Sequence, residues 1–167
     1  MSAESGQSNL KTIGSAILLA MFIRIVLFEA FEIEGPSMEP TLLNGDRVVV
    51  AKFSYGLFLP FMNEAVLSWG LPDVGDVVIV RSPRDNVDIV KRVVGLPGDT
   101  IELREGVIYR NGKVVPHASQ GSCKDRADTG PFGCEWVEEK LGDHTYRISR
   151  NLDSIRTTRA PIVRVPR

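Results

Sequence analysis

The chain has 167 residues, of which 43% are hydrophobic and 25% are charged, and its formal net charge is −1. Because a typical domain has about 100 to 150 residues, this length accommodates one compact domain and a short additional segment. A nearly neutral chain carries no basic surface for nucleic acid, so we expect no DNA or RNA partner.

The first feature along the chain is an apolar stretch from Ile13 to Phe31, interrupted by Arg24 and Glu29. About twenty helical residues span roughly 30 Å, the hydrocarbon core of a bilayer. We therefore predict a transmembrane anchor over residues 12–31, after a short N-terminal tail, 1–11. Arg24 lies about two turns before the end of the stretch, from where its long side chain reaches the headgroups.

Two other interpretations of this stretch are a buried core helix and a cleavable signal peptide. A signal peptide has a basic start and small residues at its cleavage site. Here only Lys11 precedes the apolar stretch, and Glu29-Ala30-Phe31 is a poor cleavage site. The sequence therefore favours an uncleaved anchor.

The next feature is a serine in a turn. Residues 35–42 have the sequence Gly-Pro-Ser-Met-Glu-Pro-Thr-Leu, with Ser37 shortly after the apolar stretch. By itself, a serine in such a turn is most often a turn residue. A Ser-His-Asp site is unsupported, since neither of the histidines, His117 and His144, lies in a triad motif.

The chain after residue 31 has the pattern of short strands. Asn111-Gly112 is a strong hairpin signal because both residues tolerate positive φ. We predict a mainly β, antiparallel domain over residues 32–167. The β-branched runs that support it are 48–50, 77–80, 87–94, 107–109 and 113–115.

Residues 55–70 are more apolar than an ordinary loop. They either pack on the sheet or form a patch that enters the membrane interface beside the anchor. The apolar residues concerned are Phe58, Leu59, Phe61, Met62, Leu67 and Trp69.

A lysine lies in the middle of the third β-branched run. Strand alternation places Ile89, Lys91 and Val93 on one face, with Arg92 on the other. An edge-strand lysine that keeps its amine in water is one interpretation. The other is a desolvated general base, whose pKa must fall from about 10.4 by roughly 3 to leave the amine neutral near pH 7.

The serine turn and the lysine strand, which continues as Lys-Arg-Val-Val-Gly-Leu-Pro-Gly-Asp-Thr-Ile to Ile101, together resemble two signatures of the type I signal peptidases. These are membrane-anchored Ser/Lys endopeptidases that remove signal peptides from exported proteins. The resemblance extends over residues 12–115. It implies an antiparallel β fold and a single-pass protein of the bacterial inner membrane, with its catalytic domain on the extracytoplasmic side.

The resemblance also implies roles for particular residues. Ser37 is the nucleophile, Lys91 is the general base, and Met38 shapes the substrate pockets. Many members carry a serine where this chain has Gly35, so the oxyanion would rely on backbone N–H groups, above all that of Ser37. The implied partners are membrane lipid and preproteins with small residues before the scissile bond, bound as an added strand. No cofactor is implied.

The two cysteines, Cys123 and Cys134, lie in a glycine-rich loop. They are either a disulfide, as in an oxidising compartment, or two reduced thiols. A zinc site with His117 and His144 is disfavoured, since the spacing matches no common zinc motif.

The end of the chain departs from the family. The resemblance predicts a block with Gly-Asp-Asn-Arg and Asp-Ser-Arg, yet only a weak echo occurs at residues 153–156. We therefore expect a peptidase domain that is C-terminally incomplete, with an arginine-rich end in place of a strand. An alternative function follows: a membrane-anchored relative that binds export substrates without cleaving them. A Ser/Lys self-cleaving repressor is disfavoured, since no DNA-binding helix pair is evident.

Overall fold

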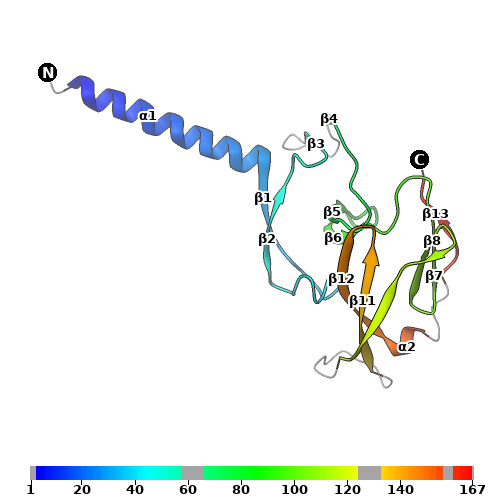
Figure 1. Cartoon of the computed structure of the whole chain (residues 1–167). Coiled ribbons are helices and arrows are strands. Elements are labelled where there is room, and N and C mark those ends of the chain that lie inside the picture. The colour runs from blue at the N-terminus through cyan, green and yellow to red at the C-terminus, as the bar shows by residue number, and fades with distance from the viewer. Residues whose placement is uncertain (1–2, 58–65, 124–132, 156–159, 167) are drawn as a thin grey trace. The chain divides into compact units, whose positions relative to one another are not determined.

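The computed structural model describes residues 3–57, 66–123, 133–155 and 160–166 (Figure 1). The chain forms two compact units. One comprises Met1–Glu32 and Arg47–Leu71, and the other comprises Ile33–Asp46 and Pro72–Arg167.

The first unit begins with a helix, α1, followed by short antiparallel strand pairs. In the β1–β2 pair, Phe28 lies opposite Ala51 and Glu32 lies opposite Arg47. The elements are α1 (Ala3–Phe22), a π-helical segment η1 (Ile23–Leu27), β1 (Phe28–Glu32), β2 (Arg47–Ala51), β3 (Gly56–Leu57) and β4 (Leu67–Ser68).

The helix that we expected to continue to Phe31 ends earlier, and residues 28–31 belong to strand β1. No helix in the described part of the chain is long and apolar enough to cross a membrane. The strand forms because β2, with its β-branched run 48–50, offers it a hydrogen-bonding partner, and this pairing overrides the apolar helical pattern. The ring of Phe28 also packs edge-on against Phe53, at 5.6 Å between centroids.

The apolar segment 55–70 is described only in part. Leu67 and Trp69 are exposed, and the segment contains the short antiparallel pair of β3 and β4. The other apolar residues of our prediction, Phe58, Leu59, Phe61 and Met62, lie outside the described residues.

The second unit consists of three antiparallel sheets in its described residues. One pairs β5 (Val77–Arg81) with β6 (Asp88–Arg92). A second has the order β13-β7-β8-β9 and contains β7 (Thr100–Arg104), β8 (Val107–Arg110), β9 (Lys113–Val114) and β13 (Val163–Arg164). The third has the order β10-β11-β12 and contains β10 (His117–Ser122), β11 (Cys134–Leu141) and β12 (His144–Asn151), followed by the single turn α2 (Leu152–Ile155).

The mainly β, antiparallel part of the predicted fold class is confirmed, because the strands are antiparallel and helical content is small, whereas the predicted transmembrane helix is not found in the described residues. The runs at 48–50, 77–80 and 87–94 form strands β2, β5 and β6, and Asn111-Gly112 turns between β8 and β9. The sequence did not reveal the long hairpin of β11 and β12. Along β11 the buried positions include Val137, Glu139 and Leu141. Because a glutamate occupies the middle position, the sequence lacks the alternation of apolar and polar residues that predicts a strand.

The C-terminal residues do contain a strand, contrary to our expectation. Val163 lies opposite Ile101 and Arg164 lies opposite Thr100, which adds β13 to the edge of β7. Val165 extends this contact, since its N–H donates to Asp99 O at 2.9 Å and its carbonyl accepts from the Gly98 N–H at 3.0 Å. The pairing forms because β7 has a free edge on that side and Val163 is β-branched.

The core of the second unit joins the sheets. Val74, Val115 and Leu141 are buried together, and the partly buried residues around them are Val94, Leu96, Ile108 and Tyr146. Gly75 permits this approach, because a Cβ there would lie 2.6 Å from the His144 ring and 2.8 Å from Leu141 O. The turn before β5 is therefore packed closely against the β11–β12 hairpin.

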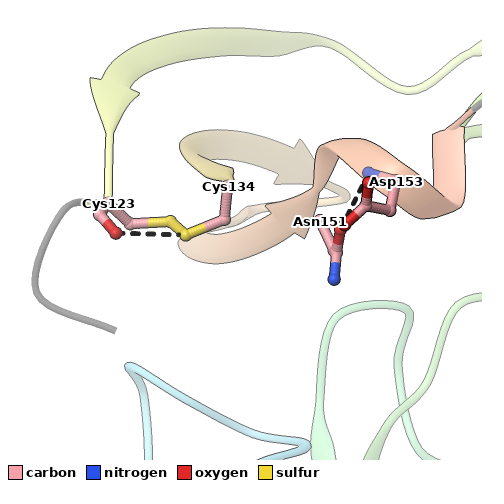
Figure 2. The surroundings of a disulfide bond; sticks show 4 residues. All are labelled: Cys123, Cys134, Asn151 and Asp153. Atoms are coloured by element: carbon pink, nitrogen blue, oxygen red, sulfur yellow. Dashed lines mark hydrogen bonds between the residues drawn. A yellow bond between two sulfur atoms is a disulfide. The ribbon is translucent and has the colours of Figure 1, made fainter. Parts of the chain in front are cut away.

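The two cysteines form a disulfide between the start of β11 and the residue after β10 (Figure 2). Their Cα atoms are 5.4 Å apart, and both residues are buried. Close by, at the end of β12, the Asp153 N–H donates to Asn151 Oδ1 at 2.8 Å, which caps the short α2 (Figure 2). Of the two states that the sequence left open, the structure therefore contains the disulfide.

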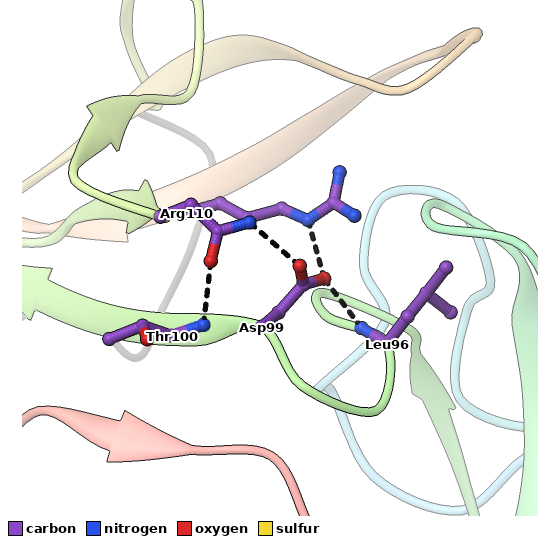
Figure 3. A network of polar contacts seen from close by, with 5 residues as sticks. Leu96, Asp99, Thr100 and Arg110 are labelled. Carbon is purple, nitrogen blue, oxygen red and sulfur yellow. Dashed lines mark hydrogen bonds and ion pairs between the residues drawn. The ribbon is translucent and has the colours of Figure 1, made fainter. Parts of the chain in front are cut away.

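Asp99 organises the turn between β6 and β7 (Figure 3). Its carboxylate accepts hydrogen bonds from the Leu96 N–H at 2.8 Å, from Asn111 Nδ2 at 2.7 Å and from Arg110 Nε at 2.7 Å. These donors, the backbone N–H of Leu96 first, lower the pKa of Asp99 from 3.8 to about 2.

We predict that Asp99→Asn lowers the free energy of unfolding, because an amide nitrogen cannot accept the bonds that one carboxylate oxygen accepts. A depressed carboxyl pKa stabilises the fold above the unfolded pKa, and this contribution is lost as pH falls through the folded pKa. The difference between wild type and variant should therefore be full above about pH 4 and shrink towards about pH 2. Urea unfolding followed by circular dichroism at several pH values measures it.

A matched control is Asp88→Asn. Asp88 pairs with Arg81 at 3.2 Å, but both side chains are substantially exposed, so the expected loss is small. If the loss caused by Asp99→Asn had the same size at every pH, the Asp99 carboxylate would not be its source.

Candidate active site

Ser37 lies in a loop, residues 33–46, that is closed at its base by backbone hydrogen bonds. The Ile33 N–H donates to Asp46 O and the Gly45 N–H donates to Ile33 O, each at 2.8 Å. Ile33 and Met38 are buried beneath the loop, whereas Ser37 is exposed. The loop therefore holds the serine hydroxyl at the surface of the second unit.

Hydrogen bonds within the loop fix the conformation of the serine turn. The Gly35 N–H donates to Asn44 Oδ1 at 2.8 Å, and the Leu42 N–H donates to Met38 O at 3.0 Å. Gly35 has a φ of +86°, a backbone conformation that residues other than glycine rarely adopt. The glycine in the motif is therefore explained by the backbone of the turn.

Lys91 approaches Ser37 from strand β6, where it lies opposite Val78 of β5. Its Nζ donates a hydrogen bond to Ser37 Oγ at 2.7 Å, across a separation of 54 residues in sequence. As strand alternation predicted, the side chain of Arg92 takes a different direction, and its Nη1 donates to Gly75 O at 2.6 Å. The structure thus brings together the two residues that the sequence singled out.

The sequence left open whether Lys91 is desolvated or keeps its amine in water. In the structure Lys91 is exposed, and Ile89 and Val93 are only half-buried, so burial by its aliphatic neighbours is not found. Alternation predicts which side chains share a face of a strand, but it does not determine what covers that face. The amine and the serine hydroxyl therefore meet at the surface.

The sequence did not predict the surroundings of Arg92. The guanidinium lies 3.8 Å from the centroid of the Tyr146 ring, and Tyr146 donates its hydroxyl hydrogen to Glu139 Oε2 at 3.0 Å. Tyr146 and Glu139 belong to the β11–β12 hairpin, whose residue pattern gave no strand signal. Arg92 itself was visible in the sequence as the residue after Lys91.

Comparison with known proteins identifies the family of this site. Residues 7–159 match the family described as "Signal peptidase, peptidase S26". The chain belongs to this family. The resemblance that the two motifs indicated is therefore confirmed.

Three relatives illustrate the similarity, and each is named signal peptidase I. The protein of Buchnera aphidicola subsp. Schizaphis graminum is 43% identical over 71% of this chain and 38% of its own length. That of Pseudomonas aeruginosa is 36% identical over 87% of this chain and 51% of its own. That of Bacillus licheniformis is 37% identical over 84% of this chain and 76% of its own. The chain thus spans about half or less of the first two relatives.

The remaining predicted site residues lie near Ser37 in the loop. Met38 is buried, with 8% of its surface exposed. Gly35 commits its N–H to Asn44, so this group does not point at a substrate oxyanion. Of Gly35 and Ser37, Gly35 therefore has its N–H engaged within the loop.

We predict that Gly35→Ser destabilises the loop. No heavy atom lies within 4 Å of a Cβ at Gly35, so a side chain has space, but the φ of +86° strains any L residue. The expected loss is about 1 to 2 kcal/mol of the free energy of unfolding. If residue 35 had a negative φ, a serine at this position could supply a further oxyanion donor without a cost in stability.

Gly70→Ser is the matched control, because Gly70 also has open space around its Cβ position and no positive φ. Urea unfolding of both variants separates strain from side-chain chemistry. Equal stability of Gly35→Ser and wild type would refute the role of backbone strain at this position.

Proposed function

We propose that this chain is a signal peptidase, an endopeptidase that removes N-terminal signal peptides from exported preproteins with a Ser37/Lys91 dyad. The observation that carries the proposal is the distance of 2.7 Å between Lys91 Nζ and Ser37 Oγ, the two side chains of the two sequence motifs. Membership of the signal peptidase family supports it.

In the proposed reaction, the neutral amine of Lys91 takes the proton of the Ser37 hydroxyl as its oxygen attacks the scissile carbonyl carbon. A separation of 2.7 Å is within hydrogen-bond reach for this proton transfer. The ammonium then gives the proton to the leaving amine, and an acyl-enzyme remains on Ser37. Lys91 next takes a proton from water as the water oxygen attacks the ester carbonyl carbon. It returns that proton to Ser37 Oγ when the ester bond breaks, which restores the hydroxyl and the neutral amine.

The oxyanion of the tetrahedral intermediate would be held by the backbone N–H of Ser37. Gly35 contributes indirectly, since its positive φ and its bond to Asn44 fix the turn that aims this N–H. Buried Met38 would form the floor under the small side chains that precede the scissile bond. The substrate would lie as an extended strand across the exposed dyad.

We further propose that the N-terminal segment associates with the bacterial inner membrane, with the catalytic domain outside the cytoplasm. Large apolar side chains exposed along α1 support an apolar surrounding for this helix. They are Leu10, Ile13, Ile17, Leu18, Leu19, Met21 and Phe22.

The proposal predicts that Ser37→Ala and Lys91→Arg each lower the rate of preprotein cleavage by about 1000-fold or more, because neither variant retains both nucleophile and base. A guanidinium stays protonated and cannot replace an amine as a base. Gel analysis of mature product, with circular dichroism to verify folding, measures the effect.

Ser54→Ala and Lys113→Arg are matched controls, since each removes the same groups from an exposed position elsewhere in the described chain. Both should cleave at the wild-type rate. Turnover by Lys91→Arg close to that of wild type would exclude Lys91 as the base.

The proposal also predicts the pH dependence. Only the deprotonated amine accepts the serine proton, so kcat/KM should rise with pH, by about tenfold per pH unit on the acid side of the profile. Cleavage of a preprotein between about pH 6 and pH 10 tests this rise. A rate that falls with increasing pH over this range is incompatible with a lysine base.

A further inference from the structure

Arg92 connects three separate segments of the second unit. Its Nη1 donates to Gly75 O at 2.6 Å, its Nη2 donates to Thr41 Oγ1 at 3.4 Å, and its guanidinium carbon lies 3.8 Å from the centre of the Tyr146 ring. These partners belong to the turn before β5, to the serine loop and to strand β12. One half-buried side chain therefore contacts each of them.

The position of the Tyr146 ring is fixed by a second contact, with Glu139. Tyr146 lies opposite Glu139 in the β11–β12 ladder and donates its hydroxyl hydrogen to Glu139 Oε2 at 3.0 Å. Burial, and after it the Glu139 charge, raises the pKa of Tyr146, so the phenol stays a donor at neutral pH. The ring is thereby held in place under the guanidinium, an arrangement that is favourable for a cation.

The position of Arg92 in the chain gives these contacts a consequence for the site. Arg92 follows Lys91 directly, and Thr41 shares a turn with Ser37. The serine loop is therefore joined to β6 twice, by the bond from Lys91 to Ser37 and by the bond from Arg92 to Thr41. A single contact leaves the loop free to pivot about it, whereas two contacts restrict both distance and orientation.

We infer that Arg92 is a positioning residue. Through Thr41, and with Gly75 and Tyr146 as its own supports, it holds the serine loop on β6 so that Ser37 Oγ stays within reach of Lys91 Nζ. This inference rests on the proposed function for its effect on catalysis. Its effect on the loop is independent of that function.

The central test is Arg92→Lys, which retains the charge but loses the planar fork that reaches two acceptors and stacks on the ring. We expect kcat for preprotein cleavage to fall by about 10- to 100-fold, since small misplacements of a catalytic group have effects of this size. KM should stay within about twofold, because Arg92 is not proposed to touch the substrate.

Arg104→Lys is the matched control. Arg104 lies 4.7 Å from the centre of the Tyr109 ring and pairs with Glu102, so it makes the same kinds of contact on β7 and β8, without contact to the serine loop. Its kcat should stay within about twofold of wild type. An equal fall in both variants would reduce the effect of Arg92 to general stability and overturn the inference.

A second variant, Thr41→Val, removes the oxygen that Arg92 reaches, at an exposed position where folding should be unaffected. If both residues act through one contact, the double variant should cleave no more slowly than Arg92→Lys alone. Arg104→Lys with Thr41→Val should instead show the product of the separate effects. Independent effects of Arg92→Lys and Thr41→Val would overturn the inference. The Thr41→Val variant by itself tests the same contact, and cleavage at the wild-type rate by this variant would also overturn it.

Hydrogen exchange of the Leu42 amide reports on the loop without any substrate, since this N–H donates to Met38 O. Exchange should be faster in Arg92→Lys and in Thr41→Val than in wild type or Arg104→Lys. Unchanged exchange would overturn the inference while leaving the proposed function standing. If wild type cleaves no preprotein, the proposed function fails, and faster exchange would still support the role of Arg92 in the loop.

Discussion

The hydrogen bond between Lys91 and Ser37 is the interaction on which the proposed chemistry depends, and it joins residues 54 positions apart. Neither side chain reaches the other through local structure. The serine needs a closed loop, 33–46, and the lysine needs the paired strands β5 and β6. Every element that fixes one of these segments therefore contributes to the distance between the two side chains.

Much of that support comes from the β11–β12 hairpin. Its buried residue Leu141 packs with Val74 and Val115, and Gly75 allows the turn before β5 to approach it closely. The same hairpin presents Tyr146 to Arg92, on the strand that carries Lys91. The β11–β12 hairpin contains no recognisable motif residues, yet its contacts help to position the strand that carries Lys91.

The exposure of Lys91 and Ser37 changes how the proposed mechanism has to exclude water. In the described chain the fold itself does not bury the amine, so a peptide bound as an extended strand across the dyad would remove water from both groups. In the proposed function, binding of the substrate is then also the step that removes water from the Lys91 amine. Family membership and the short distance between Lys91 and Ser37 are the observations on which we propose a peptidase and not a relative that only binds export substrates.

The sequence by itself determined the family, the antiparallel β class and the residues that meet in the candidate site. These features depend on local chemistry: β-branched runs, an Asn-Gly turn, and two motifs of fixed spacing. Only the tertiary structure decided that residues 28–31 form a strand, that Glu139 and Tyr146 support Arg92, and that Lys91 is exposed. Each of these depends on a partner distant in sequence. Local propensity cannot specify which strand will pair with β1, or what will cover one face of β6, because pairing and coverage are set by the packing of the whole unit.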